Sequence, residues 1–135
     1  MISLPSLLGA LRAILQAHPL CEKVTGVETR EFSSDQFSFA IRANLAGAKK
    51  LQVRIYYNRG HVDYAYQLFT DVPLLRWDNK EEFRHLATYP HHHHDEQGHV
   101  KQSPLSGDPS RDMGIVLQEI DRFLSGRAKK FRRKT

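Results

Sequence analysis

FSFAIRANLAGAKKLQVRIYYNRGHVDYAYQLF, residues 37–69, is the most regularly patterned stretch of this sequence. Apolar and polar side chains alternate in three segments of it, Phe37–Ile41, Leu51–Tyr57 and Val62–Leu68. A period of two places the apolar side chains on one face of each strand, as in an antiparallel sheet covered on one side. Short turns containing Asn and Gly separate the segments, which favours consecutive hairpins.

The same pattern extends more weakly to both sides of this stretch. Val24–Phe32 alternates and predicts a preceding strand, while Leu74–Trp77 predicts a fifth short strand. Before them, leucine and isoleucine recur at three- and four-residue spacing in Leu4–Leu15, which predicts an amphipathic helix. Ser3 has the side chain of an N-cap, and Pro19 stops this helix.

The periodicity disappears between Asp78 and Pro109, so a long irregular loop is expected there. A final apolar stripe, Met113–Leu124, predicts a C-terminal helix that begins at Asp108 or Ser110 and ends at Gly126. The order of helix, four to five strands, histidine-rich loop and helix predicts an α+β domain.

The chain has 135 residues, which is the size of one domain, and we expect residues 1–126 to form it. A single cysteine, Cys21, excludes an intramolecular disulfide. No apolar run is long enough to cross a bilayer, and the first 15 residues lack the features of a signal peptide. The sequence therefore predicts a cytoplasmic protein without membrane partners.

The positive charge of the chain is concentrated at its C-terminus. The formal net charge is +5, yet six of the 20 basic residues lie within residues 127–134. Residues 127–135 are expected to form a disordered basic tail, which attracts polyanions without sequence specificity. Four residues of this tail are predicted to contact an acidic substrate: Lys129, Lys130, Arg132 and Arg133. A solvated tail that only aids solubility is an alternative.

Histidines form the most distinctive local feature of the sequence. Six of the eight lie between His85 and His99, and His91–His94 are consecutive. Zinc is one ligand to consider, but alternate residues of an extended segment face opposite sides, and no paired Cys or HExxH motif is present. We therefore expect no metal or other cofactor. A structural role in a shallow core is a second alternative.

Acid–base chemistry is the third interpretation of the cluster and the one we favour. Metal-independent RNA cleavage needs groups that exchange protons near neutral pH and a cation that stabilises the phosphate. Histidines supply the first, and Arg76, at the end of a predicted strand, supplies the second. Tyrosines of the predicted hairpins, such as Tyr66, could stack on bases, although cross-strand packing is their more common role.

Three blocks of sequence stand out: Tyr64–Gln67 (YAYQ), Arg76–Asn79 (RWDN) and Thr88–His94 (TYPHHHH). Together they resemble the TumE-like toxins, within a similarity that spans Lys50–Leu124. Seven residues match the family pattern position by position: Arg76, Trp77, Asp78, Asn79, His91, His92 and His94. His93 stands where a lysine is common. Lys80–Phe83 replaces a second histidine pair of the family, and His85 is the candidate to take its place.

The resemblance implies the toxin half of a type II toxin–antitoxin pair, whose antitoxin is a DNA-binding protein, of helix-turn-helix type, encoded by the adjacent gene. Our first hypothesis is an endoribonuclease in which His91 and His94 act as base and acid in either order. His92 belongs to the same catalytic unit, Arg76 stabilises the phosphate and Asp78 orients a neighbour. Trp77, Asn79 and Tyr66 are expected to contact the substrate. The alternative is a non-catalytic module that binds nucleic acid or protein through the tail and the tyrosine-bearing sheet.

Overall fold

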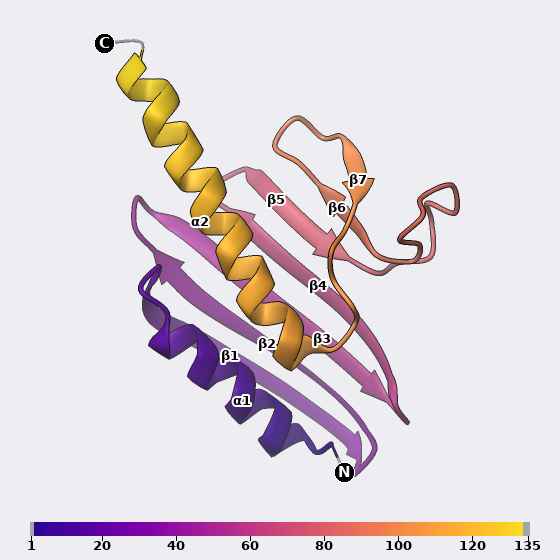
Figure 1. Ribbon diagram of the computed structural model, residues 1–135. Coiled ribbons are helices and arrows are strands. Elements are labelled where there is room, and N and C mark those ends of the chain that lie inside the picture. The colour runs from indigo at the N-terminus through magenta and orange to yellow at the C-terminus, as the bar shows by residue number, and fades with distance from the viewer. Residues whose placement is uncertain (1, 134–135) are drawn as a thin grey trace.

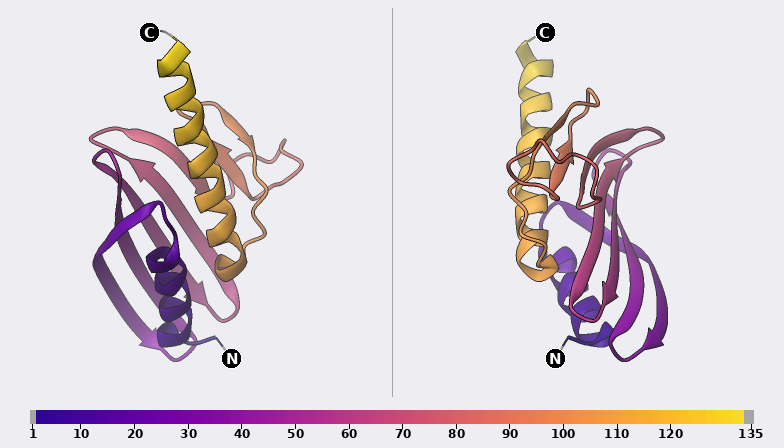
Figure 2. Two further views of the ribbon diagram at one scale, coloured as in Figure 1. Left: turned by 60° about the vertical axis from the view of Figure 1, so that its left-hand side comes forward. Right: turned by 90° about the vertical axis from the view of Figure 1, so that its right-hand side faces the viewer.

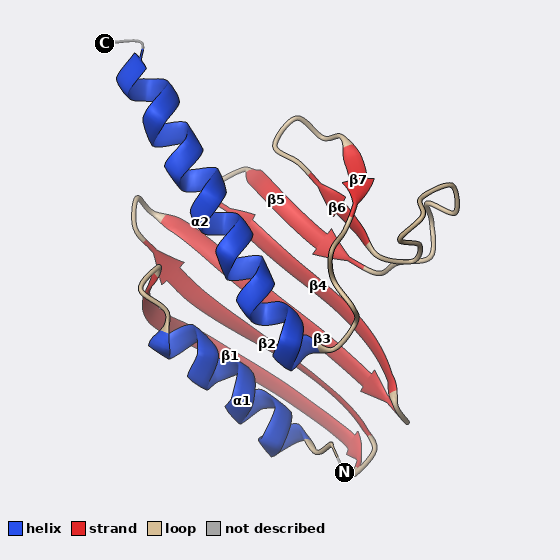
Figure 3. Ribbon diagram, in the orientation of Figure 1, coloured by secondary structure: helices blue, strands red, loops and turns tan. Residues whose placement is uncertain are grey.

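A computed structural model of the chain describes the backbone of residues 2–133 and the side chains of residues 2–127. It contains two helices and seven strands (Figure 3). The helices are α1 (Leu4–Ala17) and α2 (Pro109–Arg133). The strands are β1 (Cys21–Ser33), β2 (Gln36–Leu45), β3 (Lys49–Asn58), β4 (His61–Phe69), β5 (Pro73–Asp78), β6 (His92–His94) and β7 (Val100–Gln102). The predicted α+β class is confirmed.

The seven strands form one antiparallel sheet in which the order in space is the order in the chain. Both helices lie on the same face of this sheet, so the molecule has two layers (Figures 1 and 2). Helix α1 packs on β1 and β2 and against α2, while α2 packs on β4. We call the face toward the helices the helical face and the other one the open face.

The hydrophobic core lies between the helical face and the two helices. In β2, β3 and β4 every second residue is buried, as the alternation predicted. Leu11 and Leu15 of α1 and Val116 and Leu117 of α2 are fully buried against these strands. Ser3 is the N-cap of α1 and forms a capping box with Ser6, which confirms the predicted start of that helix.

The strand count predicted from the sequence is too low. Leu74–Trp77 lies in β5 as expected, but two further strands, β6 and β7, arise within the segment that was predicted as loop. Each is only three residues long. Their sequences, HHH and VKQ, show no alternation of hydropathy. In β6 this is because histidines occupy both faces of the strand. Their pairing with β5 places the histidines next to the RWDN block.

The predicted end of the second helix is also wrong. Helix α2 passes through Gly126 and continues to Arg133. A glycine inside a helix costs about 1 kcal/mol but does not end the helix, and the residues that follow it are good helix formers. The side chains of Lys129, Lys130, Arg132 and Arg133 lie outside the described residues, so their contacts with a substrate stay a prediction. In the described part of the chain no helix is long and apolar enough to span a membrane.

Candidate functional site

The candidate site lies on the open face, where β5 pairs with β6. Arg76 is directly opposite His94 in this pair, and Asp78 is directly opposite His92. Directly opposed residues point to the same face of a sheet, so these four side chains converge. The register of one short strand therefore brings together residues that are about 15 positions apart in the sequence.

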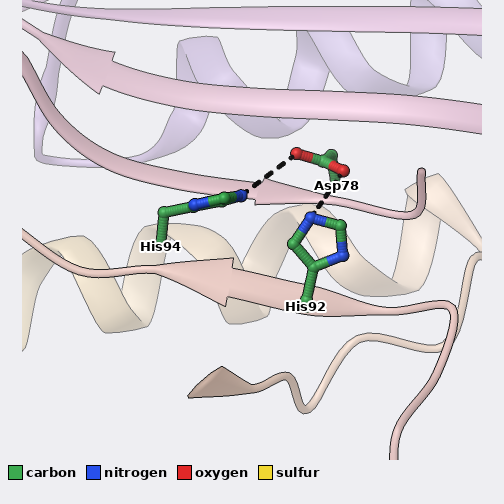
Figure 4. A group of neighbouring side chains, drawn as sticks. All are labelled: Asp78, His92 and His94. Carbon is green, nitrogen blue, oxygen red and sulfur yellow. Dashed lines mark ion pairs between the residues drawn. The ribbon is translucent and has the colours of Figure 1, made fainter. Parts of the chain in front are cut away.

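Asp78 is the centre of the cluster. Its Oδ1 lies 2.9 Å from Nε2 of His92 and accepts a hydrogen bond from the backbone N–H of Lys80 at 3.0 Å. Its Oδ2 accepts from Nε of Arg76 at 2.9 Å. The same Oδ2 lies 3.7 Å from Nε2 of His94 (Figure 4). A single buried carboxylate thus holds an arginine and two histidines in fixed positions.

The four side chains differ in their access to solvent, and this separates their roles. His92 and Asp78 are only 2% and 8% exposed, whereas His94 and Arg76 are 30% and 42% exposed. Solvent therefore reaches Arg76 and His94, while Asp78 and His92 are enclosed and support them from below. Gln67 of β4 adds a further support, because its Oε1 accepts from Nη1 of Arg76 at 3.2 Å.

The contacts of His92 fix the orientation of its ring. Its Nδ1 is 3.1 Å from the carbonyl oxygen of Pro90, and its Nε2 faces the carboxylate of Asp78. Both partners are acceptors, so whichever ring nitrogen carries the proton has a group that accepts it.

The same atoms offer a set of metal ligands. One ligand atom each from Asp78, His92 and His94 lie within 4.8 Å of one another, and zinc accepts this combination of ligands. However, the Asp78 oxygens already accept from Arg76 and face His92 at hydrogen-bond distance. A divalent cation there would compete with these contacts and would lie beside a guanidinium, which repels it.

Phe83 encloses the two histidines from the loop between β5 and β6. Its ring packs edge-on against His92 and His94, with centroids 4.7 and 6.0 Å away. Burial is accordingly the main cause that lowers the pKa of His94, although the nearby Asp78 carboxylate raises it. His94 is therefore neutral at pH 7 and able to accept a proton.

His91 and His93 lie away from this cluster. His93 points to the helical face, where it stacks on Trp77 with centroids 4.9 Å apart. Nδ1 of His91 lies 2.7 Å from the hydroxyl of Tyr64, a residue buried on the helical face. A Cβ placed on Gly107 would be 3.2 Å from the His91 ring, which shows how closely this loop covers it. The described geometry therefore does not bring His91 and His94 together, although the sequence predicted them as an acid–base pair.

Of the remaining predicted site residues, Trp77 and Asn79 have hydrogen-bond partners within the fold, whereas the buried hydroxyl of Tyr66 has none among the described residues. Trp77 and Tyr66 are fully buried on the helical face, and the indole N–H of Trp77 donates to Oε2 of Glu119 at 2.8 Å. The Asn79 side chain accepts from the Tyr64 N–H and donates to the Val62 carbonyl, which ties the end of β5 to β4. Their contacts with a substrate stay a prediction.

Two residues of the site were missed from the sequence. Gln67 carries no signal of its own, because its position beside Arg76 depends on the register of β4 against β5. Phe83 lies in a segment without periodicity, where an isolated aromatic residue gives no indication of its neighbours. The place of Gln67 in the site follows only from the strand pairing, and that of Phe83 only from the course of the loop between β5 and β6.

The pKa shifts predict how stability depends on pH. Burial is the main cause that lowers the pKa values of His91, His93 and His94 below their ordinary value of 6.5. In mild acid the unfolded chain therefore binds more protons than the folded one, and the free energy of unfolding should fall as the pH drops from about 7 to about 5. Urea titrations across this range measure the effect.

Two variants make this measurement specific. His93→Gln removes one of the buried rings and should weaken the pH dependence. His99→Gln changes a histidine that is 67% exposed and should leave it unchanged. A free energy of unfolding that stays constant or rises on acidification would contradict the prediction.

Comparison with known proteins assigns a family. The family model described as Toxin TumE matches residues 10–124, which is most of the chain and includes all four residues of the cluster. No curated protein and no solved structure matches the chain. The chain therefore belongs to the TumE toxin family, and membership of a toxin family implies an antitoxin as its partner.

Proposed function

We propose that this TumE family member is the toxin of a type II toxin–antitoxin pair and acts in the cytoplasm as a metal-independent endoribonuclease. The observation that supports this best is the pairing of a half-buried arginine with a half-buried neutral histidine over a buried carboxylate. Arg76 and His94 are the two groups that a phosphodiester can reach, and Asp78 fixes the distance between them.

The cluster suits the chemistry of RNA cleavage. Nδ1 of neutral His94, the ring nitrogen that does not face Asp78, takes the proton of the ribose 2′-hydroxyl, and the 2′-oxygen attacks the adjacent phosphorus. The bond from phosphorus to the 5′-oxygen breaks, which leaves a 2′,3′-cyclic phosphate, and the departing oxygen takes a proton from water. Arg76 stabilises the negative charge that builds on the phosphate, because a guanidinium donates two parallel hydrogen bonds to phosphate oxygens.

Asp78 and His92 serve this reaction without touching the substrate. The carboxylate lies 3.7 Å from Nε2 of His94 and stabilises the imidazolium that forms when His94 accepts a proton. Nε2 of His92, 2.9 Å away, holds the other carboxylate oxygen in place. This assignment differs from the sequence-based one in that His94 is the base and water, in place of a second histidine, protonates the leaving oxygen.

The proposed partner is a DNA-binding antitoxin of helix-turn-helix type encoded by the adjacent gene. The concentration of basic residues in 127–134 gives an acidic surface of such a protein its strongest electrostatic target, because residues 1–126 carry a formal charge of −1. Binding there would place the antitoxin on the C-terminal part of the chain.

Incubation of the purified protein with total RNA in the presence of EDTA tests the proposed activity. We expect fragments that end in a 2′,3′-cyclic phosphate, because the 2′-oxygen is the nucleophile. The His94→Ala protein, purified in the same way, reveals any contaminating nuclease and should leave the RNA intact. Intact RNA with the wild-type protein would overturn the proposal, and toxicity that persists in His94→Ala cells would favour a non-catalytic binding module.

A further inference from the structure

The open face of the sheet extends from the candidate site to the far edge of the molecule. In the part of the chain that the structure describes, both helices pack on the helical face, and no helix covers the open one (Figure 2). Most of this face is formed by β2, β3 and β4, whose open-face side chains are half-buried or exposed. A surface of this extent beside Arg76 and His94 is available to a substrate.

Basic residues dominate the open face. From Gly26 of β1 to the end of β5, the strand registers place five of them there: Arg30, Arg42, Lys50, Arg54 and Arg76. The same registers place three acidic residues there: Glu28, Asp63 and Asp78. The five basic and three acidic residues leave a formal charge of +2 on this face, and Asp78 is paired with Arg76. Although residues 1–126 are nearly neutral overall, this face is therefore positive.

One cross-strand row leads directly into the candidate site. Successive strand pairs align Arg42 with Gln52, Gln52 with Gln67, Gln67 with Arg76, and Arg76 with His94. The row from Arg42 to Arg76 spans three strand spacings, or about 14 Å. Its two arginines are held in place, because Gln52 accepts from Nε of Arg42 at 3.0 Å and Gln67 accepts from Arg76.

A shallow hollow of about 550 Å³ lies beside this row. Ala40 and Ala65 flank Arg54 on the neighbouring strands, so small side chains leave the guanidinium accessible. Arg54 forms no ion pair with any side chain of the described residues. Tyr56 also lines the hollow, and its ring is held by a hydrogen bond from Gln36 to its hydroxyl at 2.8 Å.

We infer that the open face binds single-stranded RNA, with phosphates on Arg42 and Arg54 and a base stacked on Tyr56. This inference rests on the proposed ribonuclease activity and names its substrate class. Accessible arginines suit phosphates, and a fixed aromatic ring in a shallow hollow suits an unpaired base. An RNA strand that follows the row from Arg42 then places another of its phosphates beside Arg76 and His94.

Binding of a short 2′-O-methyl RNA tests the inference, because this RNA lacks the nucleophile and stays uncut. In an Arg42→Gln/Arg54→Gln double variant we expect the affinity at 0.1 M salt to fall by about fivefold for each lost phosphate contact, roughly 25-fold in total. The slope of log affinity against log salt should decrease by about 1.4, because each phosphate contact with a single strand contributes about 0.7. Fluorescence anisotropy of the labelled RNA at several salt concentrations gives both quantities.

Arg12→Gln is the matched control, because Arg12 is exposed on α1 and lies on the other side of the sheet. It should leave both quantities unchanged. Equal affinity of the wild type and the double variant would overturn the inference, and so would duplex RNA that binds as tightly as the single strand. If the double variant binds RNA as tightly as the wild type but no longer binds the antitoxin, the open face is a binding site for the antitoxin instead.

The two proposals fail in different ways. If the open face does not bind RNA, the wild-type protein still cuts RNA in EDTA and the double variant cuts it equally well. If the protein is not a ribonuclease, ordinary RNA stays intact whatever the outcome of the binding experiment.

Discussion

Replacement of His94 by alanine should reduce RNA cleavage by the purified protein by about 10²- to 10⁴-fold, the usual contribution of a general base. His94 is the more accessible histidine of the cluster, with a side chain that is 30% exposed. Its partial burial lowers its pKa, so the wild-type ring is neutral and accepts a proton at neutral pH. The alanine variant retains Arg76 and Asp78, and it should therefore still bind RNA. Cleavage rates and RNA affinity measured on the same preparations separate the two effects.

Two other histidines provide the controls for this result. His99→Ala removes an exposed ring that lies near Asp95 and should leave cleavage unchanged. His91→Ala removes the ring that contacts Tyr64 and should change the cleavage rate far less than His94→Ala. If His91→Ala reduces cleavage as strongly as His94→Ala does, the original assignment of the two histidines as an acid–base pair is correct and the single-histidine mechanism is not.

Replacement of Trp77 by alanine should lower the free energy of unfolding by about 3–5 kcal/mol, the cost of removing a large buried aromatic ring. Trp77 is fully buried, stacks on His93 and donates its indole N–H to Glu119 of α2. Its loss leaves a cavity and deprives β6 and α2 of a shared contact. For a domain of this size the melting temperature should fall by roughly 10–20 °C.

Urea unfolding followed by circular dichroism measures this change. Phe32→Ala is the control, because this large apolar residue lies at the end of β1 and is 60% exposed. Its effect should stay within about 0.5 kcal/mol. Similar losses for Trp77→Ala and Phe32→Ala would show that Trp77 is not an important contact between the sheet, β6 and α2.

The fold could be predicted from the sequence wherever burial on one side of an element makes its hydropathy periodic. β2, β3 and β4 are buried on one face and exposed on the other, so their hydropathy alternates and their hairpin order follows from the short turns. At Arg59 and Gly60 the backbone has φ values of 49° and 91°, as expected for the tight turn between β3 and β4. The two helices show their apolar stripes for the same reason.

The candidate site could be predicted only in part. The sequence indicated Arg76, Asp78 and the histidine run as neighbours, but it could not tell which histidines share a face with the arginine. That depends on the register of β6 against β5, which places His92 and His94 on the open face and His93 on the helical face. A shift of one residue would exchange them. Four identical side chains in sequence contain no pattern from which such a register can be inferred.

The order of the strands has a consequence for the time at which the protein becomes active. Each strand pairs with the next one made, so the sheet can assemble during translation. Helix α1 precedes the strands and covers β1 and β2, but the part of the helical face that lies under α2 stays exposed until α2 has been synthesised. Translation of the 25 residues of this helix takes about 1–5 s. A nascent chain thus exposes apolar surface over that interval, during which an antitoxin already present in the cell can meet it before its histidine strand is locked in place.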